Sequence, residues 1–481
     1  MINSTNVIWT TFYPVLPEIL LLMLGFGVMG LDLFGGKNRS LMPWCTALGA
    51  LMVLAAVIMH PVISGFEGMI LSDSYAMFFK VICLAGLIMT ALLSDHYCRA
   101  HMVNQGEYYF LLIFATVGMM IMASAGDLLV LYLGLELMAL SVYCLIGMLK
   151  RDQRSSEAAV KYFLMGAFAS AILLYGMALV YGLTGTTSIA TIAELTASGA
   201  VLQSPALFAA LTLLMAAFCF KVAAAPFHFW TPDVYEGAPT TVTAFMSVAP
   251  KAASFAVLGR VMVEVFPLLH DYWGGLLAIL ALLTMAVGNI TALAQTSIKR
   301  MLAYSAIAHA GYALLGILAG TPEGLSATMG YLFIYAFMTM GAFAVLVLLA
   351  EKEADRETLD DYKGLAKTNP LAAMLMLLFM FSLIGIPPTA GFIGKFYVLK
   401  AALGAGYLLT VIGAVIFSAI SAYYYLRVVR YMYMHEPAEP VKLRYSPAIS
   451  VVLGLSLLGV VGLGLFPDFL IDQAASALFG R

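Results

Sequence analysis

The feature that most limits how this chain can fold is its succession of long apolar runs. Of its 481 residues, 63% are hydrophobic and 10% are charged. Each run is long enough to contain the about 18 to 25 residues with which a helix crosses ~30 Å of hydrocarbon. They are continuous rather than alternating, which argues against a membrane β-barrel. The sequence therefore predicts an all-α polytopic membrane protein.

Fourteen apolar runs cover most of the chain. Their approximate bounds are 14–34, 41–63, 73–93, 107–126, 128–150, 158–184, 205–235, 238–263, 272–297, 301–320, 325–350, 370–400, 404–430 and 446–475. A strongly polar stretch, 351–369, connects two of the runs and is too short for a domain of its own. We therefore expect a single membrane domain over residues 1–481, with about fourteen transmembrane helices.

The distribution of basic residues predicts the orientation in the membrane. Apart from five lysines inside the runs and Arg481 at the end, all but two of the 24 lysines and arginines fall in odd-numbered loops. The two exceptions are Arg260 and Lys400. Because basic residues collect in cytoplasmic loops, we expect the odd-numbered loops in the cytoplasm and both termini outside it.

Five lysines lie inside apolar runs, where an ammonium group is costly: Lys80, Lys161, Lys221, Lys251 and Lys395. Each costs about 2.5 to 3.5 kcal/mol at a helix centre, and charges retained at that cost usually mark ion or proton pathways. Lys80 lies only a turn and a half into the third run. Its side chain can extend toward the interface, so we leave it out of the core set.

Prolines interrupt two of the runs close to such lysines. In the seventh run Pro226 follows Lys221 by five residues, and a proline ring both removes an N–H and clashes with the carbonyl four residues back. In the twelfth run Pro387 and Pro388 precede Lys395. We therefore expect helices 7 and 12 to be discontinuous. Broken helices at corresponding places in two halves of a chain are typical of inverted-repeat transporters, although proline kinks also occur in structural helices.

Glu136 is the main carboxylate within the apolar runs. It lies nine residues beyond Asp127, about 13 Å into the slab, and therefore near its midplane. Lys161 in the next run is its expected partner, and Glu157, four residues before Lys161, is a secondary candidate. The alternative is a static ion pair that only fixes helix packing.

Two histidines, His228 and His309, lie deep in the runs. His228 follows Lys221 by seven residues, which favours a proton relay, whereas for His309 relay and packing are equally open. Burial lowers the pKa of an ammonium and a nearby carboxylate raises it, so a change in pairing can switch a buried amine between holding and releasing a proton. We therefore hypothesise a lateral, water-bridged proton path through Lys221, His228, Lys251 and Lys395.

The chain also carries collinear motifs of a known family. They include TPDVYEGAP at 231–239, QTSIKRMLAYSAIAHAGY at 295–312 and GIPPTAGFIGKFYVLKAA at 385–402. Over roughly residues 105–435 the chain resembles the antiporter-like N subunit of bacterial proton-pumping NADH:quinone oxidoreductase, respiratory complex I. The first three runs and the last are less diagnostic.

This resemblance implies a fold of fourteen helices with two inverted five-helix repeats. The first repeat would span 105–263 and the second 272–430, with 1–104 before them and a final helix at 446–475. The resemblance also implies residue roles. Glu136 and Lys161 would form the coupling pair, and Lys221 would be the central proton carrier. His228 and Lys251 would connect the path, and Lys395 would be the exit-side lysine.

The resemblance further implies where the chemistry and the partners lie. This chain would hold no cofactor or metal, while FMN, iron–sulfur clusters and quinone would lie in other complex I subunits. The five scattered cysteines have no C-x-x-C spacing, which agrees with that expectation. Expected partners are neighbouring antiporter-like and small membrane subunits, membrane lipids and protons, in a bacterial inner membrane with both termini periplasmic. A net charge of −2 gives no indication of nucleic acid.

Three alternatives remain at this point. The chain could belong to a multisubunit sodium/proton antiporter or a membrane-bound hydrogenase, although a sodium site favours clustered oxygen ligands over ammonium groups. A cytochrome b type enzyme would need paired axial histidines, and only His228 and His309 lie deep in the runs. A purely structural scaffold would leave the cost of the buried lysines unexplained.

Overall fold

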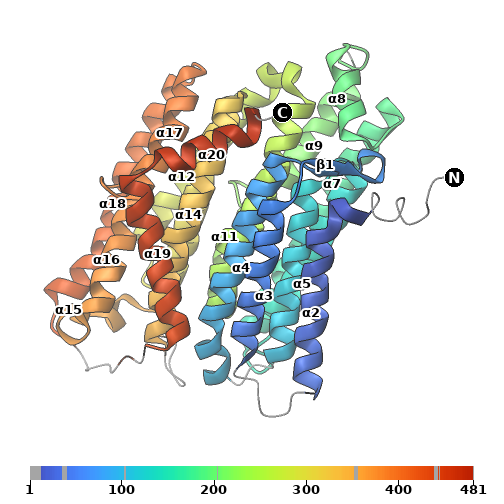
Figure 1. Cartoon of the computed structure of the whole chain (residues 1–481). Coiled ribbons are helices and arrows are strands. Elements are labelled where there is room, and N and C mark those ends of the chain that lie inside the picture. Colours follow the sequence, from blue (N-terminus) through green and yellow to red (C-terminus); the bar gives the residue numbers. More distant parts are fainter. Residues whose placement is uncertain are drawn as a thin grey trace.

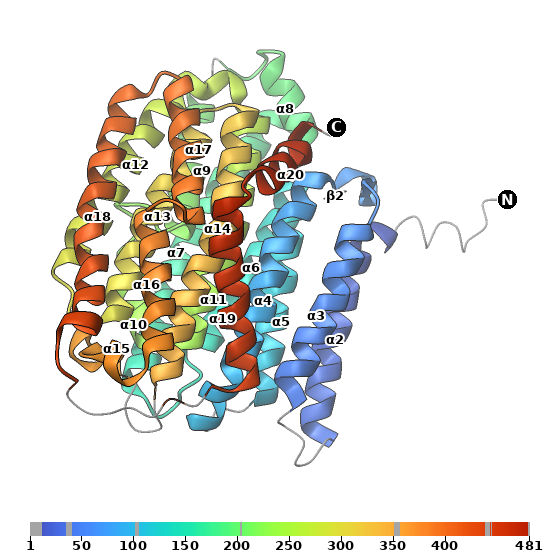
Figure 2. The same cartoon turned by 60° about the vertical axis from the view of Figure 1, so that its left-hand side comes forward.

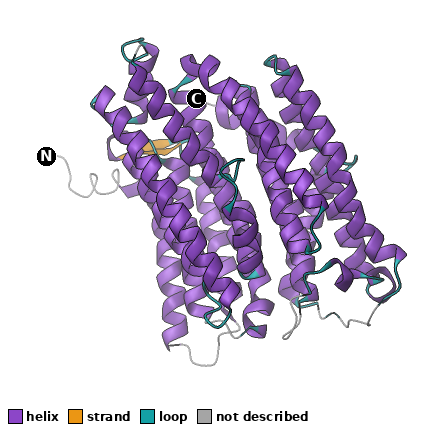
Figure 3. Ribbon diagram, turned by 180° about the vertical axis from the view of Figure 1, so that it is seen from behind, coloured by secondary structure: helices purple, strands orange, loops and turns teal. Residues whose placement is uncertain are grey.

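The structure is a computed structural model that describes residues 12–34, 41–101, 105–202, 204–350, 356–437, 443 and 445–479. These residues are almost entirely helical (Figure 3). Twelve of the described helical segments are long and apolar enough to cross a membrane, and two shorter apolar helices, Pro205–Lys221 and Pro370–Ile384, accompany them. The predicted all-α polytopic membrane fold is confirmed.

The helices of the first half are α2 (Leu16–Phe34), α3 (Met42–Met59), α4 (Ser74–Ala100), α5 (Gln105–Ser124), α6 (Leu128–Ile146), α7 (Gln153–Thr184), α8 (Ile189–Ala197), α9 (Pro205–Lys221), α10 (Trp230–Gly237) and α11 (Thr240–Gly259). Those of the second half are α12 (His270–Leu293), α13 (Ile298–Leu318), α14 (Pro322–Leu349), α15 (Leu365–Thr368), α16 (Pro370–Ile384), α17 (Ala390–Gly404), α18 (Leu408–Met434), α19 (Pro447–Leu465) and α20 (Asp468–Phe479).

Short elements complete the chain. They are the 3₁₀ turns η1 (Tyr13–Val15), η3 (Phe66–Gly68), η5 (Pro267–Leu269) and η6 (Leu359–Tyr362), the π-helical turn η4 (Arg260–Val265), and the strands β1 (Ile63–Gly65) and β2 (Ile70–Ser72). The two strands pair antiparallel, with Ile63 opposite Ser72. This hairpin, α8 and α20 lie at one end of the bundle and α15 at the other (Figure 1).

The helix starts follow local sequence signals. The side chain of Asp73 accepts from the backbone of Ala76 at the start of α4, and Asp127 accepts from Leu129 at the start of α6. Proline occupies the first turn of α3, α9, α14, α16 and α19, where its missing N–H costs nothing.

The last apolar run differs from its prediction. We expected one helix over 446–475, but α19 ends at Leu465 and a separate helix, α20, begins at Asp468. The reason is Pro467, whose ring disfavours helical backbone at Phe466, and Phe466 has a non-helical ψ of 65°. The chain therefore turns, and α20 packs across α14 and α4.

The interior of the bundle is formed by α11, α13 and α14. The apolar stretch that includes α11 is 100% buried, and those of α13 and α14 are 94% and 89% buried, against 28% for α18. The flanks are α2 and α3 on one side and α12 and α18 on the other (Figure 2). A Cβ added at Gly118 would lie 2.5 Å from the Met138 nitrogen, so α5 and α6 can pack closely only with glycine there.

Candidate functional site

The first break in the bundle lies between α9 and α10. Helix α9 ends at Lys221, and the chain runs without regular helix through Pro226 until α10 begins at Trp230. Its freed backbone groups find partners elsewhere: the Ala225 N–H donates to Thr284 Oγ1 on α12 at 2.9 Å, and Trp230 Nε1 donates to the Phe220 carbonyl at 3.0 Å. The backbone of the break is therefore stabilised by these hydrogen bonds, without one from Lys221.

Lys221 is buried, yet its ammonium nitrogen has no hydrogen-bond partner among the described residues. It lies 6.0 Å from the centre of the Phe220 ring, too far for more than a weak attraction. A small cavity, which Tyr162, Tyr235 and Ser254 also line, reaches both Lys221 and Lys251. The two lysines thus share one enclosed space.

Lys251, on α11, also lines that cavity. It is buried, and its Nζ donates to the carbonyl of Ala306 on α13 at 2.6 Å. The ammonium also lies 5.7 Å from the centre of the Tyr335 ring on α14. Lys251 therefore connects the cavity to α13.

The second break lies between α16 and α17. Helix α16 ends at Ile384, Gly385 adopts a left-handed φ of 91°, and α17 begins at Ala390 after the two prolines, Pro387 and Pro388. Lys395, inside α17, is buried and donates to the Ile384 carbonyl at 2.8 Å and to Ser418 Oγ at 3.0 Å. Here the lysine satisfies a carbonyl that the broken helix leaves free.

His309 lies on α13 within a network of hydroxyl groups. Its Nδ1 is 2.5 Å from the Tyr331 hydroxyl and its Nε2 is 3.2 Å from the Tyr425 hydroxyl. The Tyr425 hydroxyl is in turn 2.5 Å from Ser305 Oγ. Both ring nitrogens therefore have partners, and the geometry suits a histidine that passes protons between hydroxyls.

One face of α13 brings these groups into a row. Ala306, which binds Lys251, is followed three residues later by His309 and three after that by Tyr312, whose ring centre lies 4.6 Å from the Lys395 ammonium. Residues at this spacing lie on one face of a helix. The row leads from the cavity shared by Lys221 and Lys251 to Lys395 at the second break.

The expected pair of Glu136 and Lys161 does not form. Lys161 Nζ instead pairs with Glu157 at 2.7 Å and with Asp233 at 2.9 Å. Glu136 accepts a hydrogen bond from Ser170, which lies nine residues, or about 13 Å, along α7 from Lys161. Glu136 therefore lies at the depth of Ser170, and no ion pair joins it to Lys161 in the described part of the chain.

Asp233 is the partner of Lys161 that the sequence analysis missed. It lies on α10, directly after the first break, and also faces Arg300 on α13 at 3.2 Å. Arg300 forms a second ion pair, with Glu236 on α10. The only signal in the sequence was the place of Asp233 in the motif TPDVYEGAP. The spacing of residues along α7 does not show which side chains of α10 lie beside Lys161.

His228 lies in the segment between α9 and α10 and not on a continuation of α9. It is buried, stacks on Phe229 with ring centres 4.6 Å apart, and its Nδ1 has no hydrogen-bond partner in the described ranges. Because the helix is interrupted, the two-turn spacing from Lys221 no longer places both side chains on one face. No hydrogen bond joins them among the described residues.

Lys80 does not extend to the interface as expected. It is 1% exposed and pairs with Glu18 on α2 at 2.7 Å, and Ser124 Oγ also donates to that Glu18 oxygen at 3.4 Å. The reason is the carboxylate on α2, which supplies a partner inside the bundle. Among the residues that the structure covers, no group of three or more His, Cys, Asp or Glu side chains could hold a metal ion.

Comparison with known proteins extends these observations. Residues 125–421 match the family described as "NADH:quinone oxidoreductase/Mrp antiporter, TM". The chain is 52% identical to NADH-quinone oxidoreductase subunit N of Desulfovibrio desulfuricans, over 95% of this chain and 94% of that protein. It is 45% identical to the subunit N of Trichlorobacter lovleyi, over 96% of each.

Solved structures show the same fold. A chain of respiratory complex I from Thermus thermophilus with bound aureothin is 35% identical, with a TM-score of 0.80, over 96% of this chain and 100% of that one. A chain of the Mrp complex from Dietzia sp. is similar with a TM-score of 0.81 at 22% identity, over 97% of each, which is a likeness of fold alone.

Proposed function

This chain belongs to the subunit N family of NADH-quinone oxidoreductase, and we propose that it conducts protons through the row of buried groups between its two helix breaks. As a member, it is an antiporter-like membrane subunit of complex I. The observation that carries the proposal is the face of α13 on which Ala306, His309 and Tyr312 connect Lys251 to Lys395. Buried ionisable groups are costly inside a membrane protein, and those that are retained usually mark ion or proton pathways.

In the proposed path Lys221 is the group that exchanges protons most readily. Its ammonium has no hydrogen bond among the described residues, so releasing a proton breaks none. The cavity it shares with Lys251 supports transfer between the two amines. From Lys251 the path continues along α13 through the hydroxyls around His309 to Lys395, whose two acceptors hold it in place.

We propose that the ion pairs of α10 couple this path to the rest of the enzyme. Lys161 on α7 and Arg300 on α13 both bind Asp233, one turn after the first break. A shift of α7 that released Lys161 would change the charge around α10 and thereby the field at Lys221. Glu136, bound by Ser170 on the same α7, would move with it.

The assembly follows from family membership and the distribution of charge. We propose that the end of the bundle with α15 faces the cytoplasm, because the basic loops lie there, and that both termini are periplasmic.

FMN, iron–sulfur clusters and quinone would be bound by other subunits. Neighbouring antiporter-like and small membrane subunits would be the direct partners. Helices α5–α11 and α12–α18 would be two inverted repeats, each with one break.

The test is Lys221→Met in the intact complex, reconstituted into vesicles. We expect NADH:quinone turnover coupled to proton uptake to fall about tenfold or more, as when a proton-transfer group is removed. The matched control is Lys363→Met, since Lys363 lies in the polar connection and pairs with Asp360 at 2.8 Å. Unchanged protons per NADH at unchanged turnover in Lys221→Met would contradict the proposal.

A further inference from the structure

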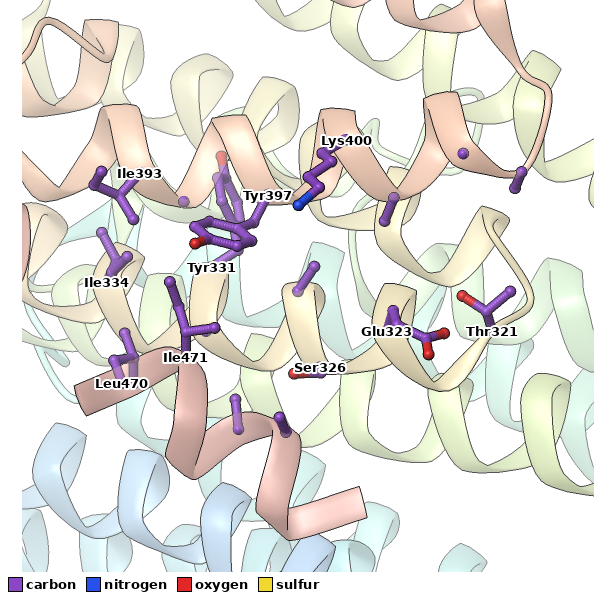
Figure 4. Close-up of a pocket in the computed structure, with 18 residues that line it drawn as sticks. Thr321, Glu323, Ser326, Tyr331, Ile334, Ile393, Tyr397, Lys400, Leu470 and Ile471 are labelled. Carbon is purple, nitrogen blue, oxygen red and sulfur yellow. The ribbon is translucent and has the colours of Figure 1, made fainter. Parts of the chain in front are cut away.

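A second cavity lies beside the row of ionisable groups. It is a cavity of about 450 Å³ between α14, α17 and α20. Figure 4 shows Ile334, Ile393, Leu470 and Ile471 converging at one end of it. Alanine and glycine residues complete most of the remaining wall, so the interior is mostly apolar.

The other end of this cavity carries two opposite charges. Glu323 lies in the first turn of α14, and Lys400 lies near the end of α17 (Figure 4). Both side chains are exposed, and neither forms an ion pair with another described residue. Lys400 Nζ lies 5.9 Å from the centre of the Tyr397 ring, which leaves its three N–H groups available.

The depth of the cavity matches one leaflet of a bilayer. Along α14 the lining extends from Glu323 to Ile334, eleven residues or about 16 Å at 1.5 Å per residue. Half of a hydrocarbon core of ~30 Å is about 15 Å. The charged end therefore lies where headgroups lie, and the apolar end lies where an acyl chain ends.

We propose that this cavity binds a zwitterionic phospholipid of the phosphatidylethanolamine type. Its phosphate would bind Lys400, its ammonium group would bind Glu323, and one acyl chain would fill the apolar space. An anionic lipid would also suit Lys400 but would place uncompensated negative charge beside Glu323. The pair of opposite charges above an apolar cavity thus selects the headgroup.

The bound chain would contact a residue of the path. The Tyr331 ring lines the cavity, and its hydroxyl binds His309. A lipid in this place would exclude water from that side of the hydroxyl network. This consequence rests on the proposed function, whereas the lipid site itself does not.

The test uses the intact complex in vesicles doped with a photoactivatable phosphatidylethanolamine that carries a diazirine near the end of one acyl chain. We expect label on peptides of α14, α17 and α20 that line the cavity. The blocking variant is Gly330→Leu, because an added Cβ at Gly330 meets nothing within 4 Å and the side chain would fill the cavity. Gly454→Leu on α19 is the matched control, with equally open space and no place in this lining.

We expect Gly330→Leu to reduce label on these peptides about fivefold or more and Gly454→Leu to leave it unchanged. The phosphatidylglycerol version of the probe should label the wild type less, and Glu323→Gln should bring the two probes to equal labelling. Equal labelling of the wild type by both probes, label that Gly330→Leu does not reduce, or cross-links showing another subunit in the cavity would overturn the proposal.

Discussion

The two helix breaks use their lysines in opposite ways. At the first break Lys221 is the last residue of α9, and its ammonium has no hydrogen-bond partner in the described chain, because Thr284 and the local backbone satisfy the broken segment. At the second break Lys395 lies beyond the interruption and donates to the Ile384 carbonyl and to Ser418. The same pairing of proline and lysine thus gives one free cation and one anchored cation.

The difference shows that a helix break does not by itself create a proton carrier. A lysine that satisfies a freed carbonyl contributes to stability and must break hydrogen bonds before it moves. A lysine whose break is satisfied by other groups is available for exchange, at the cost of an unpaired buried charge. In this molecule the two lysines lie at opposite ends of the proposed path.

The largest expected contrast is in stability. Lys395→Met removes two charge-assisted hydrogen bonds and leaves the Ile384 carbonyl with only the longer bond from Ser418 Oγ at 3.4 Å, which should cost about 3 kcal/mol. Lys221→Met removes an unpaired buried ammonium and should leave stability unchanged or higher. The measurement is the temperature at which the fluorescently tagged chain is released from the purified complex. Equal loss in both variants would show that the two lysines are anchored alike.

Removing the side-chain acceptor of one backbone N–H at each break should have a smaller effect on stability, and the effect should differ between the two breaks. Thr284→Val deprives the buried Ala225 N–H of its acceptor at 2.9 Å, and should cost about 1 to 3 kcal/mol. Ser382→Ala removes the acceptor of the Gly391 N–H, which is longer at 3.2 Å and lies in the first turn of α17, so the cost should be less. Thermal release of the tagged chain again reports both. A larger loss in Ser382→Ala than in Thr284→Val would mean that the second break depends more on its backbone hydrogen bond than the first break does.

The smallest expected effect concerns left-handed backbone. The first break has Ala223 at φ 62°, whereas the second has Gly385 at φ 91°. Ala223→Gly should relieve strain and raise stability by about 1 kcal/mol or less, and Gly385→Ala should lower it by about 1 kcal/mol or more. Both shifts can be followed in the thermal release assay. Shifts of the same sign would show that packing rather than backbone conformation decides these positions.

Much of the fold could be predicted from the sequence because the bilayer imposes simple rules. Continuous apolar runs must be helices, and prolines next to buried lysines indicated both interruptions. The helix after Pro467 was missed because the apolar run was extended past the proline, although Pro467 marked the end of α19.

The contacts between helices could not be predicted in the same way. Lys161 was assigned to Glu136, but the side chain that reaches Glu136 is Ser170, and Lys161 binds Asp233. Spacing along one helix indicates the depth in the membrane and the helix face at which a side chain lies. It does not indicate which side chain lies opposite, because that depends on how α10 packs after the break. Lys80 was misjudged for the same reason, since its partner Glu18 lies two helices earlier.

The buried pair of Glu18 and Lys80 has a consequence for how the protein is made. Ribosomes complete α2 before α4, so Glu18 is synthesised before its partner Lys80. Either charge alone in the hydrocarbon is costly, and each is accommodated once both helices are present. A chain shortened at its beginning to remove α2 would therefore leave the buried Lys80 without this carboxylate.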